Sequence, residues 1–146
     1  MRQRKLRNLD TKYEAYSDII VDAPAEMRGR WAELSGVAPL FIEIGCGKGR
    51  FTAETAKTVP ETLYVAVEKV PDAMVVAMER VCRDETENVR FIDMDAQKLL
   101  EIFEPGEVER IYINFCDPWP SKRHAKRRLT SPLFLDIYKV LLPEGG

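Results

Sequence analysis

Acidic residues and closely spaced glycines recur in this 146-residue sequence in a pattern that suits a nucleoside ligand. The stretch EIGCGKG (43–49) has glycines that let the backbone approach a ligand closely, and the helix expected after it offers free N–H groups. Glu68 follows roughly twenty residues later, the usual place for a carboxylate that binds ribose hydroxyls. Asp95 and the stretch NFCDPWP (114–120) come after two further apolar runs. Together they predict a site built from carboxylates and open backbone.

The spacing of the glycines bears on which nucleoside the site takes. Dinucleotide-binding turns follow G-x-G-x-x-G, but here Arg50 stands where the third glycine of that pattern belongs. Glu43, two residues before Gly45, would also crowd a pyrophosphate with negative charge. S-adenosylmethionine carries an ammonium and a sulfonium, and its ribose and adenine suit Glu68 and Asp95, so the pattern favours this cofactor. Each acid also has a purely structural interpretation: Glu43 as a buried acid with a backbone partner, and Asp95 as a helix cap.

The elements that must position these residues alternate along the chain. Four apolar, β-rich runs are expected to be strands, at 40–45, 63–69, 89–95 and 108–115. Helical spacing predicts helices at 49–59, 71–84, 96–103 and 131–142. Strands that are apolar on both faces and alternate with helices are typical of a doubly wound parallel α/β sheet. Ligands of such sheets bind outside the carboxyl ends of the strands, so the acidic stretches are expected to meet at one edge.

Composition and charge narrow the class of protein. Hydrophobic residues make up 45% and charged residues 32%, which is typical of a globular domain, and no apolar run is long enough to span a bilayer. Three scattered cysteines and a single histidine indicate neither a disulfide framework nor a metal site, so we expect a reduced, cytoplasmic protein. The net charge of −2 divides into +4 over residues 1–12, +5 over 121–128 and −11 elsewhere. Two basic islands on an acidic body suggest a polyanionic partner.

Three segments carry a resemblance to a known family. EIGCGKGRF (43–51), FEPGEVERIYINF (103–115) and above all DPWPSKRHAKRRLTSPLF (117–134) resemble the bacterial tRNA (guanine-N7)-methyltransferases of the TrmB type. The resemblance covers essentially the whole chain, including the basic amino-terminal stretch. It implies a Rossmann-like, S-adenosylmethionine-dependent fold that transfers a methyl group to N7 of a guanine in the variable loop of tRNA.

The resemblance also assigns roles to individual residues. Asp117 matches the proposed catalytic residue of the family. The positions expected to bind the cofactor are Glu43, Gly45, Gly47, Glu68, Asp95 and Asp117. Those expected to contact the tRNA are Ser121, Lys122, His124 and Arg127. The family often has a lysine directly after DPWP, where this chain has Ser121, and whether Lys122 takes over that contact stays open.

The two ends of the sequence carry expectations of their own. Residues 1–20 lack clear periodicity and are expected to form a basic, mobile arm, with the methyltransferase domain over 21–146. The final LPEGG (142–146) is a turn that in this fold introduces another strand, and the family continues with further strands. We therefore expect a truncated chain that lacks the C-terminal strands of the sheet and leaves the strand at 108–115 as an exposed edge.

Two other functions are compatible with the same residues. The chain could be a methyltransferase that acts on another RNA or substrate, although the stretch KRHAKRR (122–128) argues against small molecules. It could also be a tRNA-binding fragment without catalytic activity. The sequence does not decide between a monomer and a homodimer, nor which tRNAs are recognised.

Overall fold

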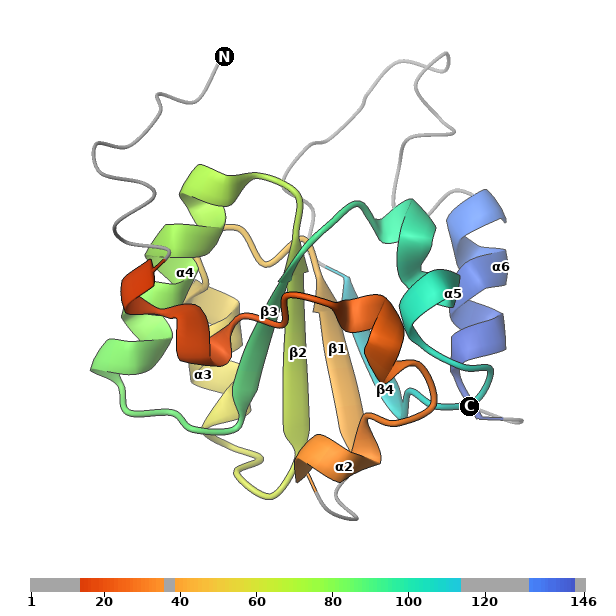
Figure 1. The fold of residues 1–146 in the computed structure, drawn as a ribbon, viewed down its shortest axis with the longest axis horizontal. Coiled ribbons are helices and arrows are strands. Elements are labelled where there is room, and N and C mark those ends of the chain that lie inside the picture. Colours follow the sequence, from red (N-terminus) through yellow and green to blue (C-terminus); the bar gives the residue numbers. More distant parts are fainter. Residues whose placement is uncertain (1–13, 36–38, 114–131, 144–146) are drawn as a thin grey trace.

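A four-stranded parallel sheet lies at the centre of the computed structural model, which describes residues 14–35, 39–113 and 132–143. The strands are β1 (Leu40–Ile44), β2 (Leu63–Glu68), β3 (Val89–Asp93) and β4 (Arg110–Ile113). Their order across the sheet is β3-β2-β1-β4, and all neighbours are parallel. Their carboxyl ends therefore share one edge, at the top of Figure 1.

Helices cover both faces of this sheet. On one face lie α3 (Arg50–Ala56) and α4 (Pro71–Arg83), and on the other α5 (Leu99–Ile102) and α6 (Pro132–Leu141), which Figure 1 shows to the left and right of the strands. The doubly wound parallel fold predicted from the sequence is confirmed, and the strands begin within two residues of the expected positions. The helix expected at 96–103 is divided into a 3-10 turn, η3 (Ala96–Lys98), and α5.

The strands divide their side chains between two apolar clusters, one on each face. Ile42 and Val65 belong to the cluster under α5 and α6, while Tyr64 and Ala66 belong to the cluster under α3 and α4. Because successive residues of a strand point to opposite faces, strands covered on both sides must be apolar at nearly every position. This double burial explains why the strands could be recognised as continuous apolar runs.

The segment 14–35 passes in front of the strands in the view of Figure 1 and meets the sheet at its β3 edge. It contains η1 (Ser17–Ile19), η2 (Pro24–Met27) and α2 (Ala32–Ser35). Ile20 forms a parallel bridge with Phe91 of β3, and the Val21 N–H donates to the Phe91 carbonyl at 2.9 Å. Tyr16 and Ile19 pack against the cluster under α3 and α4. Within the stretch expected to be an arm, Tyr16, Ile19 and Ile20 therefore pack against the sheet or its helices.

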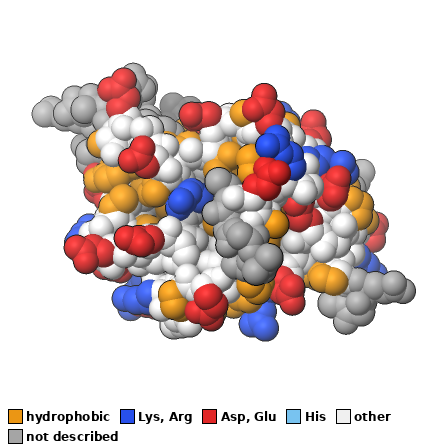
Figure 2. All heavy atoms as spheres, turned by 60° about the horizontal axis from the view of Figure 1, so that its bottom comes forward, with side chains coloured by type: hydrophobic (Ala, Val, Ile, Leu, Met, Phe, Trp, Pro, Cys, Tyr) orange, Lys and Arg blue, Asp and Glu red, His pale blue; other side chains and the backbone are white. Residues whose placement is uncertain are grey.

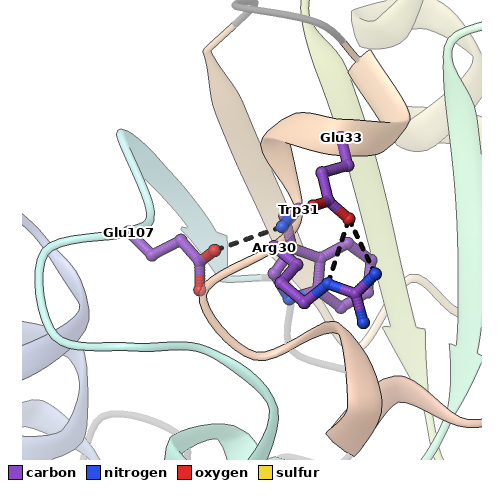
Figure 3. Close-up of polar contacts among 4 residues, drawn as sticks. All are labelled: Arg30, Trp31, Glu33 and Glu107. Atoms are coloured by element: carbon purple, nitrogen blue, oxygen red, sulfur yellow. Dashed lines mark hydrogen bonds and ion pairs between the residues drawn. The ribbon is translucent and has the colours of Figure 1, made fainter.

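Glu107 lies in the loop between α5 and β4, and its carboxylate binds this segment through hydrogen bonds. Its carboxylate accepts hydrogen bonds from the backbone N–H groups of Gly29 at 3.1 Å, Trp31 at 3.3 Å and Glu104 at 2.8 Å. Figure 3 shows Glu107 reaching the Trp31 backbone, beside an ion pair between Arg30 and Glu33. Both side chains of that pair are more than half exposed, so it contributes little to stability. The carboxylate of Glu107 thus provides three of the hydrogen bonds around the contact between two segments far apart in sequence.

The indole of Trp31 joins the same two segments through ring packing and one hydrogen bond. Its side chain is 1% exposed, its Nε1–H donates to the Ile102 carbonyl at 2.7 Å, and its ring centre lies 5.0 Å from that of Phe103. A buried indole needs a partner for its N–H, and the end of α5 supplies one. The segment 29–31 is therefore held by side-chain packing as well as by backbone hydrogen bonds.

The face of the molecule that Figure 2 presents carries mixed charge. Figure 2, which brings the lower edge of Figure 1 forward, shows Asp and Glu side chains scattered among Lys and Arg. Within residues 14–35, 39–113 and 132–143, no group of His, Cys, Asp or Glu side chains is arranged to hold a metal ion. No helix in the same ranges is both long and apolar enough to cross a membrane.

The contacts of Glu107 give a stability prediction. Glu107→Ala removes the acceptor of three backbone N–H groups, and we expect it to lower the free energy of unfolding by about 1–3 kcal/mol. Urea unfolding followed by circular dichroism measures the change, with Glu109→Ala, at an exposed glutamate two residues away, as the control. Equal stability of the two variants would contradict the role given to Glu107.

Candidate ligand site at the carboxyl edge of the sheet

The loop 45–49 connects β1 to α3 and forms the floor of the candidate site. The N–H groups of Gly45 and Cys46 donate to the Val67 carbonyl at 2.9 and 3.2 Å, which continues the pairing of β1 with β2 past the end of the strand. The Gly49 N–H then donates to the Cys46 carbonyl at 3.0 Å and closes the turn into α3. Loop and strand ends are thus joined by backbone hydrogen bonds.

Gly49 has a steric role as well as a conformational one. Its φ is +82°, in the left-handed region, and a Cβ atom built there would lie 2.6 Å from both Cα and Cβ of Ala77 in α4. Real Cβ atoms do not approach other atoms so closely, so α3 and α4 can meet at this point only because residue 49 has no side chain. The third glycine of the loop is therefore explained by helix packing.

Glu68, the last residue of β2, binds this loop directly. Its side chain is buried, and Oε1 accepts a hydrogen bond from the Gly47 N–H at 2.7 Å. Oε2 accepts from the N–H groups of Lys69 and Val70, each at 3.1 Å. One carboxylate therefore joins the loop after β1 to the turn after β2. This places two of the predicted site residues in contact.

Glu43 lies one layer deeper and is fully buried, with 0% exposure. Its Oε1 accepts hydrogen bonds from the Thr52 hydroxyl of α3 and from the Tyr64 phenol of β2, both at 2.7 Å. Burial, together with the negative charge of Glu43, raises the pKa of Tyr64 far above its ordinary value, so the phenol keeps its proton and acts as a donor. Glu43 is buried, as the structural interpretation of the sequence expected, and these two hydrogen bonds link it to side-chain hydroxyls.

Asp95 stands two residues beyond β3 and is exposed. Its Oδ1 accepts from the Gln97 N–H at 3.0 Å and so caps η3. The Met94 N–H donates to the Glu68 carbonyl at 3.2 Å, which holds the end of β3 beside the end of β2. At the end of β3 itself, partial desolvation raises the pKa of the Asp93 carboxyl, although the residue as a whole is exposed. Asp95 therefore belongs to the same edge of the sheet, but its hydrogen bond is local.

The remaining predicted site residues cannot be placed. Five of them lie outside the described residues: Asp117, Ser121, Lys122, His124 and Arg127.

The structure also adds two residues that the sequence analysis did not single out, Thr52 and Tyr64. A polar residue on the buried side of the first turn of α3, and a tyrosine within an otherwise aliphatic strand, are the signals that could have pointed to them.

The described edge has a definite chemical character. Gly45 and Gly47 leave the backbone partly exposed, and the carboxylates of Glu68 and Asp95 lie at the ends of neighbouring strands. Carboxylate oxygens accept hydrogen bonds from hydroxyl and ammonium groups, and they repel phosphate. The arrangement therefore suits a nucleoside ligand with hydroxyls and positive charge better than a dinucleotide.

Comparison with solved structures identifies the class of fold. A SAM dependent methyltransferase from Aquifex aeolicus matches with a TM-score of 0.56 and 14% sequence identity, over 89% of this chain and 66% of that chain. The sheet order and the flanking helices are accordingly those of a Rossmann-like methyltransferase fold. A sequence profile of the family described as "Putative methyltransferase" also matches residues 37–146.

Comparison with curated proteins identifies the family. The tRNA (guanine-N(7)-)-methyltransferase of Geobacillus sp. (strain WCH70) is 45% identical over 99% of this chain and 67% of its own length. The enzyme of the same name from Listeria innocua is 45% identical over 92% of this chain and 64% of its own length. The chain belongs to the tRNA (guanine-N(7)-)-methyltransferase family, and it spans about two thirds of the length of these relatives.

The close approach of α3 and α4 gives a second stability prediction. Gly49→Ala forces a Cβ against the backbone of Ala77 and strains a positive φ, so we expect a loss of about 2–4 kcal/mol. Gly106→Ala is the matched control, because Gly106 also has a positive φ, of +76°, but a Cβ there meets no atom within 4 Å. Chemical denaturation compares the two variants. A loss at Gly49 no greater than at Gly106 would show that helix packing does not require the glycine.

Proposed function

We propose that this chain transfers a methyl group from S-adenosylmethionine to N7 of a guanine in the variable loop of tRNA. The observation that carries the proposal is its 45% identity, over 99% of the chain, to a tRNA (guanine-N(7)-)-methyltransferase. The non-catalytic alternative is not favoured, because the relatives that match nearly the whole chain bear the name of an enzyme. A tRNA substrate also makes the cytoplasm the expected place of action.

The described edge of the sheet fits the cofactor. Glu68 ends β2 with its carboxylate hydrogen-bonded to the glycine loop, which is where a group that holds ribose hydroxyls is needed. Gly45 and Gly47 leave the loop backbone partly exposed, Asp95 lies at the end of the adjacent strand, and Glu43 lies buried two residues before the loop. We assign these five residues to cofactor binding together with Asp117.

The reaction asks for positioning rather than for a strong base. When bound, S-adenosylmethionine supplies an electrophilic methyl group on a sulfonium. Guanine N7 has a lone pair and no proton to lose, so the protein must mainly align N7 for in-line displacement. We assign to Asp117 the role of orienting the N1–H and amino edge of the guanine and of stabilising the positive charge that methylation leaves on the purine. Prolines at 118 and 120 suit a stiff positioning loop.

The basic stretch 122–128 begins five residues after this acid in sequence. We assign Ser121, Lys122, His124 and Arg127 to the tRNA interface, with Lys122 in place of the lysine that the family often has one position earlier. Contacts of lysine and arginine with phosphates supply affinity and a strong dependence on salt, and they do not read base identity.

The catalytic assignment is tested by Asp117→Ala. Methyl transfer to unmodified tRNA transcripts is measured with labelled S-adenosylmethionine, and the product is mapped by cleavage at 7-methylguanine. We expect transfer to fall about 100-fold or more while tRNA affinity stays nearly unchanged, because one electrostatic contact at the reacting group is lost. Asp136→Ala, at an exposed aspartate of α6, is the control. Normal turnover by Asp117→Ala would refute its role, and a parental chain that binds tRNA without labelling it would favour the binding-fragment alternative.

The tRNA interface is tested by reversing charge at Lys126, Arg127 and Arg128. The triple glutamate variant should bind tRNA more weakly, and its plot of log affinity against log salt should lose about two units of slope. Arg83→Glu serves as the control, since Arg83 is exposed and ends α4. An unchanged slope in the triple variant would mean that residues 126–128 do not contact phosphates.

A further inference from the structure

The buried carboxylate of Glu43 connects three elements of the fold. Glu43 belongs to β1, Thr52 to α3 and Tyr64 to β2, and both hydroxyls donate to the same carboxylate oxygen, Oε1, at 2.7 Å. Glu43 and Thr52 are fully buried, and so is Tyr64. Hydrogen bonds in a buried place, where the local dielectric constant is low, are stronger than those at the surface.

The position of this cluster relative to the glycine loop gives it a functional meaning. Glu43 lies two residues before the loop 45–49, and Thr52 lies three residues after it. The hydrogen bond between them therefore closes the base of the loop across its two ends. Tyr64 ties that base to β2, the strand that ends in Glu68. The partner of Glu68 on the loop is the N–H of Gly47, at 2.7 Å.

The phenol and the hydroxyl are suited to this task because they remain donors. Tyr64 keeps its proton at neutral pH, since burial and the Glu43 charge raise its pKa. Neither Thr52 nor Tyr64 is among the residues that the family resemblance assigns to the site.

We propose that Thr52 and Tyr64 are positioning residues for S-adenosylmethionine, which act by holding Oε1 of Glu43 and thereby fixing the loop 45–49 beside Glu68. The inference rests on the proposed function for the identity of the ligand. The effect on the loop does not depend on that identity and is measured separately.

The test removes each hydroxyl with little change of shape, in Thr52→Val and Tyr64→Phe. Matched controls remove the same groups elsewhere. Thr58→Val deletes a hydroxyl that donates to the Thr55 carbonyl just beyond the end of α3, and Tyr138→Phe deletes a buried phenol on α6. Two quantities are measured: S-adenosylmethionine affinity by calorimetry, and amide hydrogen exchange of residues 44–51 by mass spectrometry without ligand.

We expect Thr52→Val and Tyr64→Phe each to raise the dissociation constant for S-adenosylmethionine roughly tenfold. Exchange in residues 44–51 should accelerate while exchange in β2 and β3 stays at the parental rate, and both controls should match the parental chain. In steady-state transfer assays, the KM for the cofactor should rise with little change in kcat, because the cluster acts on the loop and not on the reacting atoms.

Three results would overturn the inference or separate it from the proposed function. Unchanged loop exchange in both variants would overturn it, and so would exchange that accelerates equally throughout the sheet, since that indicates a general loss of stability. A parental chain that binds no S-adenosylmethionine would refute the proposed function, and the ligand-free exchange would then still decide whether Thr52 and Tyr64 hold the loop.

Discussion

Because helices cover both faces of the sheet, the central strands β1 and β2 have almost no position where a charge can meet water, and this constraint decides how the site is built. Glu43 and Glu68 are the charged residues buried within the described strands, and each lies at or near a carboxyl end. Both are surrounded by donors, hydroxyls for Glu43 and backbone N–H groups for Glu68. Buried carboxylates are stable only with such partners. The loop after β1, the turn after β2 and the helix α3 supply these donors, and their positions are therefore fixed as well.

The sequence was sufficient for the parts of the fold that obey a local period. Strands buried on both faces read as continuous apolar runs, and α4 could be located from Pro71 and its helical spacing. The segment 14–35 could not be predicted, because its short 3-10 turns have no period and it is held by Glu107, more than seventy residues away. The hydroxyl partners of Glu43 were not predicted for a related reason: Thr52 and Tyr64 stand out locally as polar residues among apolar ones, but the contact that joins them to Glu43 is a property of packing between three elements.

The comparisons and the geometry answer different questions. The solved methyltransferase matches at 14% identity and defines the fold alone, whereas relatives at 45% identity define the family. Neither explains how the glycine loop keeps its shape, which follows from the hydrogen bond of Gly47 to Glu68 and the contact of Gly49 with Ala77. A carboxylate has about four acceptor positions, and Glu68 uses three of them for the N–H groups of Gly47, Lys69 and Val70, so about one is left for a ligand.

The burial of Trp31 has a practical consequence for observing the molecule. The chain contains two tryptophans, Trp31 and Trp119. Trp31 reports on the attachment of the segment 29–31 to α5, because its indole is enclosed by Phe103 and bonded to the Ile102 carbonyl. Trp119 stands two residues after Asp117 in sequence. The protein thus carries two tryptophan fluorophores, one in the body of the fold and one close in sequence to the residue assigned to catalysis, and replacing either leaves the tryptophan emission of the other to be read alone.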